Sequence, residues 1–220
     1  MLRSVIVVCA LAGALIVPGA AAAATPVQPP SPADGATVGQ WDTLRYRWTL
    51  APGDVSVTRV LFARAEDFSG ARQRAELGSS AVVRLGRTVG LAPGTWYWRL
   101  CARRETDPAG TCAFEATSHR LVVASRPLPT LSRSEAERTA RYAFERRFGT
   151  GALRSRSCTR NGTAYRCSVT VRVSGRTYTG RLNAKLVPSG NLLAARWDWR
   201  VTRGRAYFTG FGTQPLGRLP

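Results

Sequence analysis

The sequence predicts a β-sandwich over residues 25–124, followed by a small, basic α+β domain over residues 131–212 in which one helix packs on an antiparallel sheet. Two patterns indicate this arrangement. Short segments in which apolar and polar residues alternate, separated by Gly, Pro and Asp turns, fill the first half. In the second half, one stretch with helical spacing of apolar residues precedes several further alternating segments.

Residues 1–24 have the composition of a secretory signal peptide. Arg3 is followed by an apolar run, residues 5–17, and then by a stretch of small residues that ends at Ala24. The run is shorter than the roughly 20 apolar residues that a membrane-spanning helix needs. We therefore expect cleavage near Ala24, no membrane span in the mature chain, and a secreted, extracellular or cell-envelope location. Retention of this segment as an anchor stays open as the alternative.

The cysteines form two local pairs. Of the five, Cys9 lies in the expected signal peptide, and the other four are Cys101, Cys112, Cys158 and Cys167. An even number in an exported chain predicts disulfides, and the spacing favours 101–112 and 158–167. A zinc site is the weaker reading, because neither pair has the C-x-x-C spacing and no histidine is near.

Two segments in the first half alternate most clearly. In residues 44–50 the apolar and aromatic side chains fall on one face and Arg45, Arg47 and Thr49 on the other. Residues 96–102 alternate in the same way, which places Cys101 on the solvent side. The one histidine, His119, shares its strand phase with apolar residues, so we expect a structural role for it rather than a catalytic one.

Four motifs in this half carry a family resemblance. They are, in order, SPADGATV, LRYRWTL, VLFARAEDFSG and LAPGTWYWRLCA. Residues 26–124 thereby resemble a fibronectin type III or related immunoglobulin-like domain of bacterial secreted proteins. The resemblance implies that Trp48 is a core tryptophan and that the turn at residues 91–95 leads into a tyrosine corner. Strand phase instead points Trp96 inward, so the hydrogen bond of the corner hydroxyl would be missing. The resemblance also implies a spacer or binding module, with no ligand that can be carried over.

A proline-containing linker, residues 125–130, separates the two halves. Pro127 and Pro129 lie one residue apart, which favours a short, stiff and extended connector. We therefore expect the two domains to be held apart and to fold independently. Residues 213–220 are expected to form a tail.

The second domain is predicted to begin with a helix capped by Ser132 and Glu135 and ended by Gly149. Strands are expected near residues 153–160, 165–173, 176–187, 192–201 and 207–211. A two-residue turn at Gly162 and Thr163 would place Cys158 directly opposite Cys167. In the fourth strand the phase makes Trp197 and Trp199 core residues and sends Asp198 to the other face, to pair with an arginine. In architecture only, this order of elements is similar to small exported domains of the cystatin-like or PepSY-like kind.

Positive charge is concentrated in the second half. The chain carries a formal net charge of +19. Residues 25–124 hold 12 arginines and nine acidic residues, a net charge of +3, whereas residues 125–220 hold 18 arginines and one lysine but only four acidic residues, a net charge of +15. This asymmetry predicts an anionic partner for the second half. A compositional bias toward arginine, without a function, stays open as the alternative.

Four arginines are the candidate anion-binding residues. Alternation places all four on the solvent side of the expected sheet, beside Tyr165 or Tyr207; they are Arg172, Arg181, Arg196 and Arg200. Guanidinium groups bind phosphates and acidic sugars through paired hydrogen bonds.

No catalytic motif is recognisable, whether a phosphate loop, a nucleophile elbow or an H-E-x-x-H helix. We therefore expect no enzyme activity, no cofactor and no metal. The leading hypothesis is a non-catalytic secreted or envelope-associated protein whose basic domain contacts an anionic envelope polymer, an acidic glycan or nucleic acid. The alternative is a protein-interaction or inhibitory module that docks another exported protein.

Overall fold

The structure of the chain is a computed structural model that describes residues 24–218, apart from 51–54, 71, 78–80, 105–107, 109–111 and 115–116. The expected signal peptide lies outside the described residues except for Ala24, where the first strand begins. Within the described residues, no helix combines the length and the apolar character that crossing a bilayer requires.

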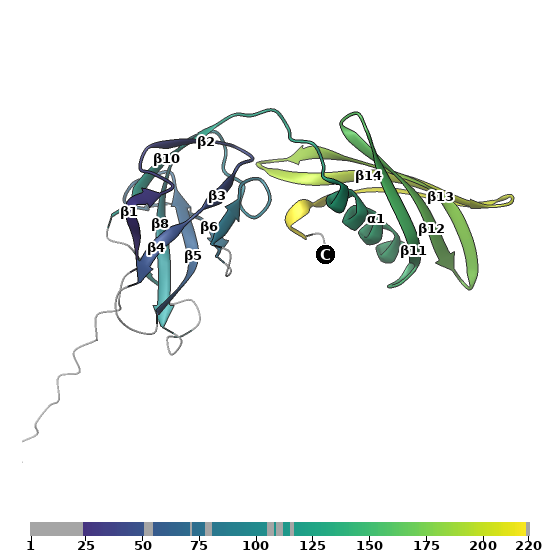
Figure 1. The fold of residues 1–220 in the computed structure, drawn as a ribbon, viewed down its shortest axis with the longest axis horizontal. Helices are drawn as coiled ribbons and strands as arrows, with labels where there is room; N and C mark the ends of the chain where they lie inside the picture. The colour runs from purple at the N-terminus through teal and green to yellow at the C-terminus, as the bar shows by residue number, and fades with distance from the viewer. Residues whose placement is uncertain are drawn as a thin grey trace, which may run out of the picture.

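In the described part of the first unit, residues 24–124, the regular elements are all strands (Figure 1). Its strands are β1 (Ala24–Ser31), β2 (Ala36–Gly39), β3 (Thr43–Arg45), β4 (Arg47–Leu50), β5 (Val55–Ala63), β6 (Arg72–Glu76), β7 (Val82–Arg84), β8 (Gly94–Arg104), β9 (Ala113–Phe114) and β10 (His119–Ala124). One sheet has the order β2-β10-β8-β5-β6, with β9 also paired to β8 and with β2 parallel to β10. The pairs β1-β4 and β3-β7 form two small sheets. The unit fits an immunoglobulin-like β-sandwich.

Aromatic side chains fill the core of the sandwich. Trp98 is fully buried, and the ring of Tyr46 contacts it edge-on with 5.1 Å between centroids. His119 is buried beside the same indole, with its ring 4.7 Å from that of Trp98. Burial raises the pKa of the Tyr46 hydroxyl well above its usual value. The inward phase expected for residues 44–50 and 96–102 is therefore observed at these positions.

Two local expectations change on strand β8. The Trp96 indole N–H donates to the carbonyl of Ala92 at 2.8 Å, so a tryptophan makes the backbone hydrogen bond that a corner tyrosine would otherwise make. Cys101 was expected on the solvent side, but it is fully buried. Its strand neighbour across the sheet is Phe114 of β9, a pairing that alternation within one strand cannot reveal.

The second unit, residues 131–218, is one helix and a five-stranded antiparallel sheet with the order β11-β12-β13-β14-β15. Its elements are α1 (Arg133–Phe148), β11 (Leu153–Asn161), β12 (Ala164–Val173), β13 (Arg176–Ser189), β14 (Leu192–Arg203), β15 (Ala206–Pro215) and the 3-10 turn η1 (Leu216–Arg218). The helix begins with the capping box of Ser132 and Glu135 and ends at Gly149. Cys158 lies opposite Cys167, as the turn at residues 162–163 predicts.

Both expected disulfides are present, joining Cys101 to Cys112 and Cys158 to Cys167. They indicate an oxidising, extracellular environment, because structural disulfides are rare where thiols are kept reduced.

The predicted fold class is wrong in its second part. Strands hold more than half of the described residues and α1 is the one α-helix among them, so the chain is largely all-β rather than a sandwich followed by an α+β domain. The strands are longer than their local patterns indicated, with β13 reaching 14 residues. The expected tail is also replaced by structure, because β15 continues to Pro215 and Leu216 is buried.

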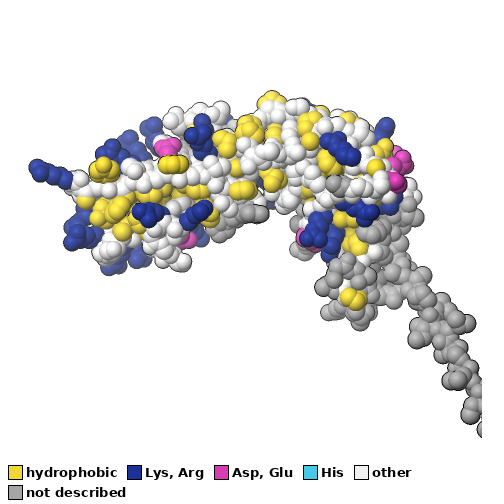
Figure 2. Space-filling view, turned by 180° about the vertical axis from the view of Figure 1, so that it is seen from behind, with side chains coloured by type: hydrophobic (Ala, Val, Ile, Leu, Met, Phe, Trp, Pro, Cys, Tyr) yellow, Lys and Arg dark blue, Asp and Glu magenta, His cyan; other side chains and the backbone are white. Residues whose placement is uncertain are grey.

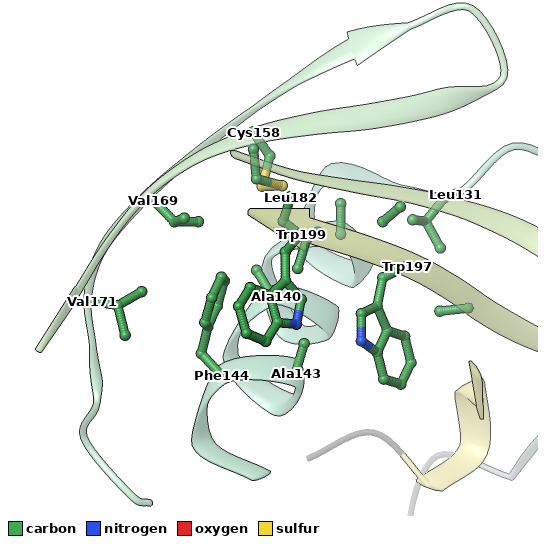
Figure 3. Packing of buried hydrophobic residues seen from close by; sticks show 14 of the residues in the cluster. Leu131, Ala140, Ala143, Phe144, Cys158, Val169, Val171, Leu182, Trp197 and Trp199 are labelled. Atoms are coloured by element: carbon green, nitrogen blue, oxygen red, sulfur yellow. A yellow bond between two sulfur atoms is a disulfide. The ribbon is translucent and has the colours of Figure 1, made fainter. Parts of the chain in front are cut away.

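The core of the second unit lies between α1 and one face of the sheet (Figure 3). Phe144 of the helix packs against Trp199 with 4.9 Å between ring centroids. Tyr142 contacts Trp197 edge-on at 5.6 Å. Both tryptophans are core residues, as the strand phase predicted.

The two units touch, contrary to the expectation that the linker holds them apart. Trp41 of the first unit packs against the core of the second. The amide of Leu193 in β14 donates to the carbonyl of Gly86. Arg87 forms an ion pair with Glu135, whose side chain is only 2% exposed. The sandwich residues of these contacts, Trp41, Gly86 and Arg87, lie far from the linker in sequence, so the linker composition could not reveal them.

We predict that Arg87→Met lowers the free energy of unfolding by about 1–3 kcal/mol, because it leaves the Glu135 carboxylate buried without its cation. Urea unfolding followed by tryptophan fluorescence measures this. The double variant Arg87→Met/Glu135→Gln should recover part of the loss, since glutamine keeps the capping box without a buried charge. An unchanged midpoint for Arg87→Met would contradict a stabilising contact between the units.

Candidate anion-binding face

Helix α1 covers one face of the five-stranded sheet, and the opposite face is open to solvent. We call this surface the open face and define it by the outward side chains of β12, β13, β14 and β15. On these strands buried and exposed positions alternate, with the apolar residues turned toward α1. Strand pairing then decides which outward side chains are neighbours.

The four predicted arginines are all exposed, and all lie on the open face. Arg181 of β13 lies directly opposite Arg200 of β14. Four residues further along the same two strands, Arg196 lies opposite Lys185. Arg172 of β12 lies apart, opposite Thr177 near the far end of β13. The structure therefore brings three of the four predicted residues into one cluster.

Two basic residues of this face were not among the four candidates, although Arg166 is one of the arginines whose alternation favours the same face. Lys185 completes the cross-strand pair with Arg196, and Arg166 of β12 lies opposite Asn183 in the row between the two basic pairs. The pairing register of the hairpins would have placed both beside the candidates, since it fixes which side chains share a row.

Asp198 is the one acidic side chain on strands β12 to β15, all of which are described. It was expected to pair with an arginine. Instead, its carboxylate accepts a hydrogen bond of 2.8 Å from the side-chain amide of Asn183, its neighbour across β13 and β14. The surrounding cations thus outnumber the carboxylates. Figure 2 shows one face of the molecule, on which dark-blue basic side chains far outnumber acidic ones over the lobe away from the grey trace.

The hollows on the open face are shallow. One of about 260 Å³ is lined by Lys185, Arg196, Asn183, Asp198 and Ala164. A second, of about 550 Å³, is lined by Arg181 and Arg156 together with serine and threonine residues of β11 to β14. Sites for small molecules usually enclose most of the ligand surface. These hollows suit a ligand that lies across the strands.

Two aromatic side chains border the basic cluster on the edge strand β15. Tyr207 is 60% exposed and Phe211 is 89% exposed. The guanidinium carbon of Arg200 lies 5.1 Å from the centroid of the Tyr207 ring. Of the two tyrosines expected beside the arginines, Tyr207 is exposed, whereas Tyr165 packs partly against the core. Phe211 was not predicted, although it shares the alternation phase of Tyr207.

On the opposite side of β15, two glycines make room for the core tryptophans. A Cβ atom at Gly212 would lie 2.6 Å from the Trp197 indole, and one at Gly210 would collide with that of Trp199. The two indoles and the backbone of β15 also line a groove of about 430 Å³ beneath Arg146 and Arg147 of α1. This contact holds the edge strand, and with it Phe211, against the sheet.

We predict that Gly212→Ala lowers the free energy of unfolding by about 1–3 kcal/mol, because the added methyl group overpacks a rigid indole ring. Thr213→Ala, at the next and exposed position of the same strand, serves as the matched control and should have little effect. Thermal unfolding compares the two variants. Equal stability would contradict the close packing of β15 on Trp197.

The described residues contain no group of three or more His, Cys, Asp or Glu side chains that could hold a metal ion.

Comparisons with known proteins identify no family. No family model matches the chain, and no curated protein matches it. One solved structure with some similarity is a marsupial T cell receptor, at 12% sequence identity and a TM-score of 0.27. The match covers 87% of this chain and 60% of that one. A similarity this low carries no argument about function, which therefore rests on the residues themselves.

Proposed function

We propose that this protein is a non-catalytic, exported binding protein whose open face binds an anionic polymer. The proposal rests chiefly on two cross-strand pairs of like charge, Arg181 opposite Arg200 and Lys185 opposite Arg196. Like charges directly across two strands destabilise a sheet. A polyanion lying over these pairs would replace that repulsion by attraction and would accept hydrogen bonds from the guanidinium groups.

The basic side chains are available for such a ligand. None of the ion pairs in the described part of the chain involves Arg181, Lys185 or Arg196. Arg200 is exposed, and its guanidinium group lies over the ring of Tyr207. The shallow relief of the face favours an extended polymer over a small enclosed anion.

The same proposal includes the type of the first domain and the route of export. The order of the four sequence motifs supports a fibronectin type III-like spacer in a bacterial secreted or envelope-associated protein. The composition of residues 1–24 supports export through a cleaved signal peptide. In this arrangement the sandwich is the support and the sheet of the second unit is the contact surface.

A second candidate function is the docking of another exported protein. The observation that favours it is strand β15, an edge strand of ten residues with no charged side chain and with Phe211 exposed. Exposed and uncharged edges can accept a further strand from another chain.

We predict that replacing Arg181, Lys185, Arg196 and Arg200 together by glutamine removes most of the affinity for heparin and for duplex DNA at low salt. For the duplex, the slope of log K against log salt should fall by about 3–4, because four phosphate contacts are lost. Fluorescence anisotropy with the full chain measures both.

The matched control removes the same charge from the helix on the opposite side of the sheet, through glutamine at Arg138, Arg141, Arg146 and Arg147. It should keep most of the affinity. Equal losses in the two variants would show that binding follows net charge alone, and the open-face proposal would then be wrong.

A further inference from the structure

We infer that Tyr207 and Phe211 form a stacking platform beside the cations of the open face, so that the polymer this face recognises is single-stranded nucleic acid. The inference rests on the proposed function and names the substrate class of the same site. The placement of the aromatic side chains supports it, whereas the charges support the proposed function.

The exposure of these two rings is unusual for this chain. Among the described residues, the exposed large hydrophobic side chains are Leu128, Tyr207 and Phe211. Leu128 lies in the linker, whereas the other two lie on one strand and on the same face of it. Phe211 lies four positions after Tyr207, which corresponds to about 13 Å along an extended strand. Isolated exposed apolar residues need no explanation, but this pair borders the one basic cluster of the sheet.

The strand register places arginines in the rows next to the two rings. Thr209, between the two aromatic positions, lies opposite Arg200 of β14. Phe211 lies opposite Asp198, in the row between Arg200 and Arg196. Phosphates bound at Arg200 and Arg196 would therefore run along β14, and the bases could extend outward over β15.

Bases suit the rings better than sugars do. Every base offers a flat face that stacks on an aromatic ring or on a guanidinium plane, with little dependence on sequence. Recognition of an acidic glycan would also need acceptors for its hydroxyl hydrogens. Arginine and lysine donate but do not accept, and the one carboxylate of this face, Asp198, already uses one oxygen to accept a hydrogen bond from Asn183, so the basic cluster itself offers few acceptors to a glycan.

Duplex DNA and heparin distinguish binding through charge from binding through base stacking. The duplex offers phosphates at high density but keeps the faces of its bases stacked inside the helix, as heparin offers charge without any base. A site that uses charge alone should bind single-stranded DNA, duplex DNA and heparin. A site that also stacks should lose affinity for single strands alone when its aromatic rings are removed.

The experiment compares oligodeoxythymidylate, duplex DNA and heparin, each titrated against the full-length chain by fluorescence anisotropy at low salt. Phe211→Ser and Tyr207→Ser should each lower the affinity for oligodeoxythymidylate by about tenfold or more, as expected for the loss of one stacked base. Affinities for duplex DNA and heparin should stay unchanged. Phe211→Trp should retain the single-strand affinity, and Leu128→Ser, the third exposed hydrophobic position, should affect none of the three ligands.

The other outcomes would overturn the inference in distinguishable ways. If both serine variants bind oligodeoxythymidylate as the unaltered chain does, the stacking platform is wrong, and the proposed function still stands provided the glutamine variant loses all three polymers. If all three affinities fall together, the rings support the face rather than contact bases. If light scattering shows a dimer that Phe211→Ser dissociates, the aromatic pair instead joins two copies along β15.

Discussion

One helix can cover only one face of a sheet, and most of the second unit follows from this constraint. Helix α1 has 16 residues, and it must cover a sheet whose strands reach 14 residues. Its small alanine side chains allow close approach over the centre of the sheet, while Trp197 and Trp199 fill the space toward β15. The alternate residues of the same strands have no covering layer. Most of them are polar, chiefly threonine and arginine, with a single lysine and a single aspartate.

The same helix also joins the two units. Glu135 accepts hydrogen bonds from the backbone N–H and the hydroxyl of Ser132, both at 2.8 Å, and pairs with Arg87 of the sandwich. A residue that begins the helix therefore also fixes where the sandwich lies against it. Burial and the neighbouring charges of Arg84 and Arg138 lower the pKa of Arg87, and the carboxylate of Glu135 is the anion paired with this cation.

Local chemistry explains what could be predicted from the sequence. The turn at Gly162 and Thr163 set the register that pairs Cys158 with Cys167, and the capping residues Ser132 and Gly149 set the ends of the helix. Alternation alone placed all four candidate arginines on the exposed face, and the pairing of strands then showed that Arg172 lies apart from the other three.

The errors concern contacts between distant segments. Strand pairing beyond Phe211 extended β15 and removed the expected tail, and the length of the strands shifted the fold class toward all-β. Cys101 is buried on a strand that also pairs with β9, and the contact of Trp41 with the second unit spans the linker. Alternation reports only which face of its own strand a side chain occupies, so none of these contacts could be inferred from it.

Amide chemical shifts of the isotopically labelled chain, titrated with a heparin oligosaccharide at low salt, test the central claim most directly, because they locate the ligand without any substitution. If the open face is the binding surface, the largest changes will fall on β13 and β14 around Arg181, Arg200 and Arg196. The sandwich should show little change. Largest changes on helix α1, or around Arg45 and Arg84 of the sandwich, would contradict the claim that the open face carries the function.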